Sequence, residues 1–343
     1  MRWAFLITLA GVVAGGVMTA QSALAMTAEP LGVEAVLASV ERHYPLIDAA
    51  RRDQQAADAE LLSARGAFDP AVRVRADGAP LGYYQNGRVD VLLEAPTPAW
   101  GTTLFSGYRA SFGKFPIYDG KYETNQYGEL RVGLSVPLLR NGATDRRRVG
   151  IARAELGVPL SAAAVKQARI EAARAGSFRY WEWVAAGERL RIVESLLELA
   201  VKRDRAMVDR VAAGDLARID RVDNHRAVLS RKGALVSATR ALQAAAIELS
   251  IYLRDDRGVP VVADANRLPR GFPQLDLAAD EQDTARRARD VSTALKNRPE
   301  LERLRLQREQ QRVERDFARN QGLPAIDLQA MVSQDFGPGS PTR

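Results

Sequence analysis

The hydrophobic and polar residues of the chain follow two different periods, and the first period occupies residues 70–140. Here apolar side chains recur at every second position. One run is Leu130, Val132, Leu134 and Val136, separated by Glu129, Arg131, Gly133 and Ser135; another is Leu104, Tyr108 and Phe112, separated by Thr103, Gly107 and Ser111. A period of two predicts strands with one apolar and one polar face. The segment between Phe112 and Gly128 is rich in Gly, Lys, Tyr and Asn, which predicts a loop that joins two of these strands.

The second period is helical and occupies residues 141–255. From Asn141 to Ala213 the chain predicts a long helix, with Gly157-Val158-Pro159 as the one expected interruption or bend. At ~1.5 Å per residue this stretch would measure on the order of 100 Å, a length typical of coiled coils and of the walls of large assemblies. After a turn at Gly214-Asp215, a second helix is expected to return beside the first.

Apolar residues step by threes and fours along both arms of this hairpin, which predicts a coiled-coil seam between them. The outgoing seam is Val193, Leu197, Ala200, Met207 and Val211, with Asp204 in the intervening slot, and the returning seam is Leu235, Ala238, Leu242, Ala245, Leu249 and Leu253. A second line, Ile192, Leu196 and Leu199, lies beside the outgoing seam. Two seams predict a neighbour on each side of the outgoing helix, as in a ring of helices.

Two segments repeat one pattern 254 positions apart, as Pro45 and Pro299 show. The copies share a proline near a helix start, polar helix formers, a Gly or Asn stop and a short alternating strand. The strands expected after the two helices are Ala71–Ala76 and Ala325–Ala330. Because one full unit lies between the copies, a second unit starting near Arg298 is expected to run well past residue 343. The sequence is therefore interpreted as truncated in its second repeat.

The first 25 residues have the pattern of a secretory signal peptide. Arg2 precedes an apolar run from Trp3 to Met18, and Ala23-Leu24-Ala25 forms a small-residue cleavage site. The alternative, a membrane anchor helix, is disfavoured because the run is short and no stop-transfer charges follow it. The chain contains no cysteine, which excludes a disulfide, a thiolate metal site and a lipid-bearing cysteine.

Aromatic residues crowd into the strand region, and they bear on what the apolar face of the strands contacts. They are Tyr83, Tyr84, Trp100, Phe105, Tyr108, Phe112, Phe115, Tyr118, Tyr122 and Tyr127. A half-buried soluble sheet shows the same alternation of apolar and polar residues. The aromatic content instead favours strands in a membrane, where such rings form girdles at the two interfaces. The girdle candidates are Trp100, Phe105, Tyr108 and Phe112.

Few residues suggest catalytic or ligand chemistry. His43 and His225 are isolated, and Asp220 and Asp223 alternate with Arg218 and Arg221, which favours neutralised surface charge. The cluster Tyr180-Trp181-Glu182-Trp183 faces several sides of a helix, which favours packing over a stacking platform. The net charge of +7 is dispersed along helices rather than clustered, so nucleic acid is not favoured. The sequence predicts no enzyme, metal or cofactor.

The turn between the two long helices and the repeat carry a resemblance to a known family. The segment Arg210–Asp220 reads Arg-Val-Ala-Ala-Gly-Asp-Leu-Ala-Arg-Ile-Asp, which resembles the hairpin tip of TolC-like outer-membrane factors. Pro137-Leu138-Leu139-Arg140 is similar to the point where that family's first strand hairpin leads into the long helix. Arg298-Pro299-Glu300-Leu301 and residues 322–328 are similar to its second-repeat helix and strand.

The resemblance implies a mainly α fold with a β-barrel portion: long α-helical hairpins, forming an α-barrel or coiled-coil wall, joined to membrane β-strands in a two-repeat architecture whose second repeat is incomplete. The segments would be a signal peptide at 1–25, a first-repeat helix at 26–69, outer-membrane strands with an extracellular loop at 70–140, a periplasmic helical hairpin at 141–255 with its tip near 214, an equatorial linker at 256–287 and the second repeat at 288–343.

The resemblance also implies a function. The chain would be a homotrimer subunit of an outer-membrane tunnel, a passive conduit in a tripartite efflux or type I secretion system. Its partners would be outer-membrane lipid, an inner-membrane pump and a periplasmic adaptor, with the helical portion in the periplasm. The adaptor would contact the tip residues Val211, Ala212, Ala213, Gly214, Asp215, Leu216, Ile219 and Asp220.

Two other functions are compatible with parts of the sequence. A periplasmic coiled-coil adaptor or scaffold would share the long hairpin, but it should not carry aromatic-rich strands that lead directly into the long helix. A basic helical protein that binds nucleic acid or anionic lipid would share the net charge, and the signal peptide argues against the nucleic-acid version.

Overall fold

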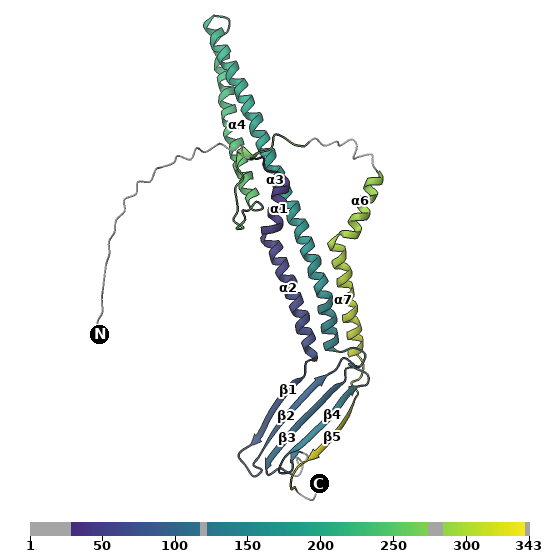
Figure 1. Cartoon of the computed structure of the whole chain (residues 1–343). Helices are drawn as coiled ribbons and strands as arrows, with labels where there is room; N and C mark the ends of the chain where they lie inside the picture. Colours follow the sequence, from purple (N-terminus) through teal and green to yellow (C-terminus); the bar gives the residue numbers. More distant parts are fainter. Residues whose placement is uncertain (1–28, 117–121, 274–283, 340–343) are drawn as a thin grey trace, which may run out of the picture.

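The computed structural model describes residues 29–116, 122–273 and 284–339; the predicted signal peptide and Tyr118 lie outside these residues, and so does part of the predicted linker. Figure 1 shows a long helical body with a twisted sheet at one end and the turn of a helical hairpin at the other. The helices are α1 (Val33–His43), α2 (Pro45–Arg65), α3 (Arg146–Ala212), α4 (Arg218–Ser250), α6 (Thr284–Asn297) and α7 (Pro299–Gln321), with short 3₁₀ turns η1 (Gly66–Phe68) and η3 (Ala265–Arg267).

The strands form one antiparallel meander in the order β1-β2-β3-β4-β5. They are β1 (Ala71–Ala79), β2 (Asn86–Pro96), β3 (Thr103–Gly113), β4 (Glu129–Pro137) and β5 (Asp327–Asp335). The predicted loop is confirmed, since the chain leaves β3 at Gly113 and enters β4 at Glu129. Strand β2 lies within the predicted strand region, and its sequence Arg-Val-Asp-Val contains the same alternation.

The two copies of the internal repeat have the same order of elements. In the first, α1 ends at His43, Tyr44 is extended, and Pro45 begins α2, which leads to β1. In the second, α6 ends at Asn297, Arg298 is extended, and Pro299 begins α7, which leads to β5. A proline is tolerated at the first helical position because the N–H group there makes no intrahelical hydrogen bond, so its absence in proline costs none. The repeat read from the sequence is therefore a repeat of structure.

Helix α3 differs from its prediction at two places. It begins at Arg146 rather than Asn141, because the Asp145 carboxylate accepts hydrogen bonds from the N–H groups of Arg147 and Arg148 and caps the helix there. It also runs through Pro159 as one continuous helix, so of the predicted interruption or bend the interruption is wrong. An interior proline costs about 3 kcal/mol, and packing of the lower half of α3 against both α2 and α7 offsets that cost.

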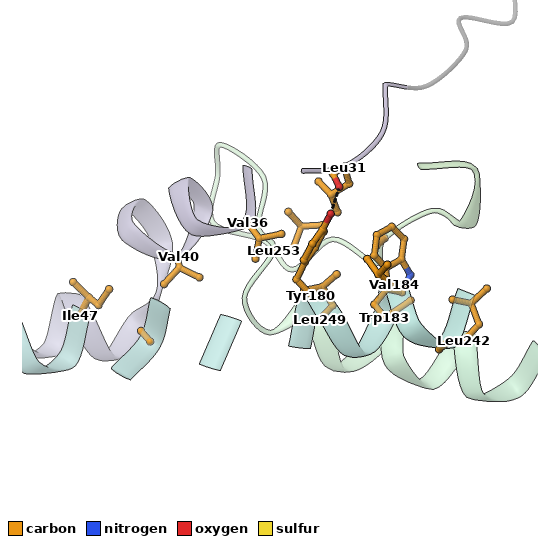
Figure 2. Close-up of a cluster of buried hydrophobic side chains, with 14 residues drawn as sticks. Leu31, Val36, Val40, Ile47, Tyr180, Trp183, Val184, Leu242, Leu249 and Leu253 are labelled. Atoms are coloured by element: carbon orange, nitrogen blue, oxygen red, sulfur yellow. Dashed lines mark hydrogen bonds between the residues drawn. The ribbon is translucent and has the colours of Figure 1, made fainter. Parts of the chain in front are cut away.

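The main core lies where α1 crosses α3 and the end of α4 (Figure 2). Val36, Trp183 and Leu249 are fully buried there. The Tyr180 hydroxyl donates a hydrogen bond of 2.8 Å to the Leu31 carbonyl, and the half-buried Trp181 ring stacks on Phe272. The aromatic cluster around residue 181 is thus packed between elements, as the sequence favoured.

The coiled-coil seam is confirmed by burial. The outgoing seam residues face α4 and are half-buried, whereas the second line, Ile192, Leu196 and Leu199, is exposed. Within the seam, Asn224 of α4 donates a hydrogen bond of 2.8 Å to Asp204 of α3, which explains the polar residue in that slot.

None of the described helices is both long and apolar enough to cross a membrane.

Candidate functional site

The two faces of the sheet differ in chemistry. Apolar side chains from all five strands occupy one face and are exposed: Val72, Val74, Val89, Val91, Leu93, Leu104, Tyr108, Phe112, Leu130, Val132, Leu328 and Val332. No described element packs over them, since each strand pairs only with its neighbours in the sheet and the helices contact one another. The exposed fraction reaches 78% at Val332 on the β5 edge and is 52% at Val132 in β4.

The opposite face carries arginines, each within 4 Å of a carboxylate. Asp90 of β2 is the centre of this network. Its carboxylate accepts two hydrogen bonds of 2.6 and 2.7 Å from the Nη2 of Arg131 in β4 and one of 3.3 Å from the Nε of Arg109 in β3. Arg109 also lies 3.6 Å from Glu129. These side chains are only 12–19% exposed, so the charges are the sheltered groups of the sheet.

The network continues to the edge strand β1. Arg88 lies 2.7 Å and Arg75 2.9 Å from Asp77, and Arg73 lies 3.0 Å from Glu94. The cross-strand register places each of these pairs on the same face as Asp90. The polar face is therefore a lattice of neutralised charges that spans four strands.

The end of the β3–β4 loop folds over this polar face at the end of the sheet far from the helices. The Tyr122 ring lies 4.4 Å from the Arg88 guanidinium carbon. Thr124 is fixed to Ser111 by reciprocal hydrogen bonds, with its N–H donating to the Ser111 hydroxyl at 2.6 Å and its hydroxyl accepting from the Ser111 N–H at 3.0 Å. The Asn125 N–H donates to Asp335 of β5.

The girdle candidates divide between the two faces. Tyr108 and Phe112 lie on the apolar face, and Trp100 lies exposed in the β2–β3 turn at the helical end of the sheet. Phe105 is an odd-numbered residue of β3 and lies on the polar face, where its ring fills the space above Gly133 in β4. The structure thus separates Phe105 from the other three, because successive strand side chains point to opposite faces.

A cleft of about 550 Å³ lies where the sheet meets the helices. It opens on the polar side, since its sheet residues Thr103, Ser135 and Asp327 occupy polar-face positions, and its floor includes Gly150 of α3. Arg146 and Arg147, from the first turn of α3, also line it. We call this the junction cleft.

The connection beside the cleft is held by hydrogen bonds to α7. Asn320, the Asn stop of the second repeat, is buried and its side-chain oxygen accepts from the Asn141 N–H at 2.7 Å. Arg148 donates to the carbonyls of Asn141, Gly142 and Ala143 and to the Asp145 carboxylate. The connection between β4 and α3 is therefore fixed to α7 and to the first turn of α3.

The hairpin tip is a tight turn at the opposite end of α3. Gly214 has a φ of 85°, the Asp215 N–H donates to the Arg210 carbonyl at 2.9 Å, and the Gly214 N–H donates to the Val211 carbonyl at 3.2 Å. This is a Schellman motif, which requires the positive φ that glycine adopts without strain. Of the predicted tip residues, Val211 and Leu216 are half-buried, whereas Ala212, Ala213, Gly214, Asp215, Ile219 and Asp220 are exposed.

The residues considered for chemistry do not gather in the structure. His43 ends α1 and His225 lies exposed on α4. Asp223 pairs with Arg226 at 3.6 Å, one turn further along the helix than the arginines that the sequence suggested. Within the described ranges, no group of three His, Asp or Glu side chains is arranged to hold a metal ion.

Comparison with known proteins identifies the fold. The sequence matches no protein-family model and no curated protein. Three solved structures have a similar backbone. The CmeC outer membrane channel of Campylobacter jejuni has a TM-score of 0.55 at 13% identity over 90% of this chain, and the outer-membrane channel OprN has 0.54 at 14% over 89%. The outer membrane protein VceC of Vibrio cholerae has 0.53 at 12% over 90%.

The chain has a TolC-like fold. The resemblance read from the tip and the repeat is confirmed at the level of architecture, with a mainly α body joined to an antiparallel sheet. The chain spans 62% of the length of CmeC, 59% of OprN and 69% of VceC. The TolC-like fold places the sheet and the hairpin tip at opposite ends of α3, as Figure 1 shows.

Proposed function

We propose that the chain is a subunit of an outer-membrane export channel, with the sheet in the membrane and the helices in the periplasm. The observation that carries the proposal is the sheet itself. Its strands of 9 to 11 residues match the length that crosses a bilayer. Its apolar face is exposed, while the charged groups around Asp90 are sheltered on the other face.

A lipid environment would account for a sheet whose apolar side chains are exposed and whose charges around Asp90 are sheltered. In lipid the apolar face is solvated by acyl chains, and the polar face lines a water-filled interior. Trp100 at the helical end, and Tyr108 and Phe112 toward the far end, supply interfacial rings. An open sheet edge is not tolerated in a bilayer, so the exposed edges at β1 and β5 support assembly with further chains, as in a homotrimer. No catalytic role is proposed, and export would be passive.

The hairpin tip is proposed as the contact for a periplasmic adaptor that joins the channel to an inner-membrane pump, in efflux or in type I secretion. Ile219 is 63% exposed at the tip and stands beside small residues, Ala212 and Ala213, over which another helical hairpin can approach closely. The proposed contact set is Val211, Ala212, Ala213, Gly214, Asp215, Leu216, Ile219 and Asp220.

Fractionation of the cell envelope tests the membrane proposal. The chain is expected in the outer-membrane fraction, migrating as an oligomer on an unheated denaturing gel and as a monomer after heating. Recovery only as a soluble periplasmic monomer would contradict the proposal.

Site-specific cross-linking tests the adaptor proposal. Because the chain has no cysteine, Ala213→Cys introduces a single thiol at the tip. A bifunctional cross-linker is expected to join it to a protein that mass spectrometry identifies as an inner-membrane-anchored periplasmic adaptor. Ser230→Cys, exposed on α4 and away from the tip, is the matched control and should give no such product. Equal cross-linking at both positions would count against a specific tip contact.

A further inference from the structure

The arginines of the molecule differ sharply in whether a carboxylate neutralises them. On the polar face of the sheet, the arginines of β1 to β4 each have a carboxylate partner. In the junction cleft, Arg146 and Arg147 are exposed and, among the described residues, have no carboxylate within the 4.0 Å of an ion pair. Arg146 and Arg147 thus place unneutralised positive charge in the cleft, whereas the arginines on the neighbouring polar face of the sheet are paired.

The carboxylates of the cleft do not remove this charge. Asp145 is committed to Arg148 at 2.7 Å and to the N–H groups that it caps. Asp327 also lines the cleft, so it offsets one of the two free arginines and leaves the site net positive. The Thr103 and Ser135 hydroxyls line the same space and are hydrogen-bond donors for a bound anion.

The position of these arginines is unfavourable for the helix that carries them. The first turn of α3 contains Arg146, Arg147 and Arg148 and no acidic residue. A helix N-terminus has a partial positive charge, so cations there reduce the stability of the helix. Arg148 compensates through its hydrogen bonds to the connection, whereas Arg146 and Arg147 make no such bonds among the described residues. Local rules of stability are broken mainly where function requires it.

The cleft is also placed where a solute would pass. It joins the polar face of the sheet to a groove along α3, in which Gly150, Arg153 and Gly157 lie between α2 and α7. Arg153 is neutralised by Glu314 at 3.0 Å. The positively charged cleft therefore lies between the groove, which also contains the carboxylate of Glu60, and the neutralised charges on the polar face of the sheet.

We propose that the junction cleft binds and favours anionic solutes, those that carry sulfonate, carboxylate or phosphate groups, and so makes the conduit anion-selective at the junction of helices and sheet. Arg146 and Arg147 supply the charge, and Thr103 and Ser135 supply hydrogen bonds. The proposal rests on the proposed channel function, which it extends to a class of solute.

Reversal potentials test the selectivity. The full chain is reconstituted in a planar bilayer under a tenfold KCl gradient, and the wild type is expected to favour chloride over potassium. Arg146→Gln with Arg147→Gln should lower the chloride-to-potassium permeability ratio several-fold, whereas Arg146→Lys with Arg147→Lys should retain it, because selectivity follows charge. The control, Arg203→Gln with Arg205→Gln, removes the same charge roughly 85 Å along α3 and should leave the ratio unchanged. A wild type that favours potassium, or a glutamine variant with the wild-type ratio, would overturn the proposal.

Dye binding tests the cleft without a conducting channel. The trisulfonated dye pyranine is titrated into the detergent-solubilised chain at low ionic strength. The dissociation constant should rise about tenfold in the Arg146→Gln and Arg147→Gln double variant, since two weakly screened attractions are lost, and should not change in the Arg203 and Arg205 control. Absence of current with this dye result would refute the channel and support the anion site. Dye binding that is absent, or equal in all variants, would refute the anion site whatever the current.

Discussion

The helical core and the sheet use the same kinds of residue in opposite ways. Where α1, α3 and α4 meet, Val36 and Trp183 are fully buried and the charged groups are outside. In the sheet, Val132 and Val332 are exposed, and the guanidinium of Arg131 is among the most sheltered groups. One region excludes water from an interior, and the other presents its apolar surface outward. This difference supports the proposal that the helical body faces water and the sheet faces lipid.

The largest expected effect is loss of the helical core. Trp183→Ala removes the largest fully buried side chain and leaves a cavity where α1 crosses α3 and α4. It should lower the free energy of unfolding by about 3–5 kcal/mol, measured by urea denaturation followed by circular dichroism in detergent. Phe178→Ala, an exposed aromatic on the same helix, is the control and should cost less than ~1 kcal/mol. Equal losses of unfolding free energy in the two variants would show that burial of Trp183 does not stabilise the fold.

The next effect separates the two solvents. Val132→Arg places a charge on the apolar face of β4 and should destabilise the membrane-inserted state by about 2–4 kcal/mol, seen as reduced assembly into the outer-membrane fraction. Val222→Arg makes the same change at an apolar position of α4 that is exposed to a similar degree and should leave assembly unchanged. If both variants assembled normally, the apolar face of the sheet would not be a lipid surface.

A smaller effect is expected in the charge network of the polar face. Asp90→Asn removes the carboxylate shared by Arg109 and Arg131 and leaves two sheltered guanidinium groups with weaker partners. It should cost about 1–3 kcal/mol, read from the thermal unfolding of the sheet. Glu198→Gln breaks the exposed i,i+4 pair with Lys202, whose hydrogen bond lowers the pKa of Glu198, and should have a much smaller effect, because water screens an exposed ion pair. A reversed order would mean that the network is not what holds the strands in register.

The smallest effect concerns one buried hydroxyl in the helical core. Burial raises the pKa of Tyr180, chiefly because the phenolate would be desolvated, with a further contribution from the charge of Glu34. A raised pKa means that the protonated form is favoured in the folded state. The stability that protonated Tyr180 contributes is thus fully present below about pH 10, the ordinary tyrosine pKa. It is lost as the pH rises through the higher pKa that Tyr180 has in the folded state.

Tyr180→Phe should therefore reduce the alkaline loss of stability. It should also cost about 1 kcal/mol at neutral pH through the lost hydrogen bond to Leu31. The measurement is the free energy of unfolding between pH 8 and pH 11 for the variant and the wild type. Parallel pH profiles for the two proteins would contradict the prediction that ionisation of Tyr180 contributes to the alkaline loss of stability.

The secondary structure of the strands and of the hairpin could be predicted from the sequence, and the predictions that failed have identifiable causes. The alternation in β4 and the seam residues such as Leu242 are local patterns, and burial follows them. Grouping Phe105 with Tyr108 ignored that residues three apart in a strand point to opposite faces. The interruption expected at Pro159 gave a local preference more weight than the packing of two flanking helices.

The charge network and the junction cleft were beyond any reading of the sequence. Asp90 and Arg131 are 41 positions apart, and only the register of β2, β3 and β4 brings them together. Arg146 and Asp327 meet at the cleft because β5, from the second copy of the repeat, pairs with β4. No local signal encodes contacts of this range.

The sequence by itself determined the periods, the repeat and the turn at Gly214, because each depends on residues that are close in the chain and on the intrinsic geometry of helix, strand and glycine. The tertiary structure decided which face of the sheet stays uncovered, which arginines find a carboxylate, and that Arg146 and Arg147 find none among the described residues. Those outcomes depend on strand order and helix packing, which bring together residues that are far apart in the chain.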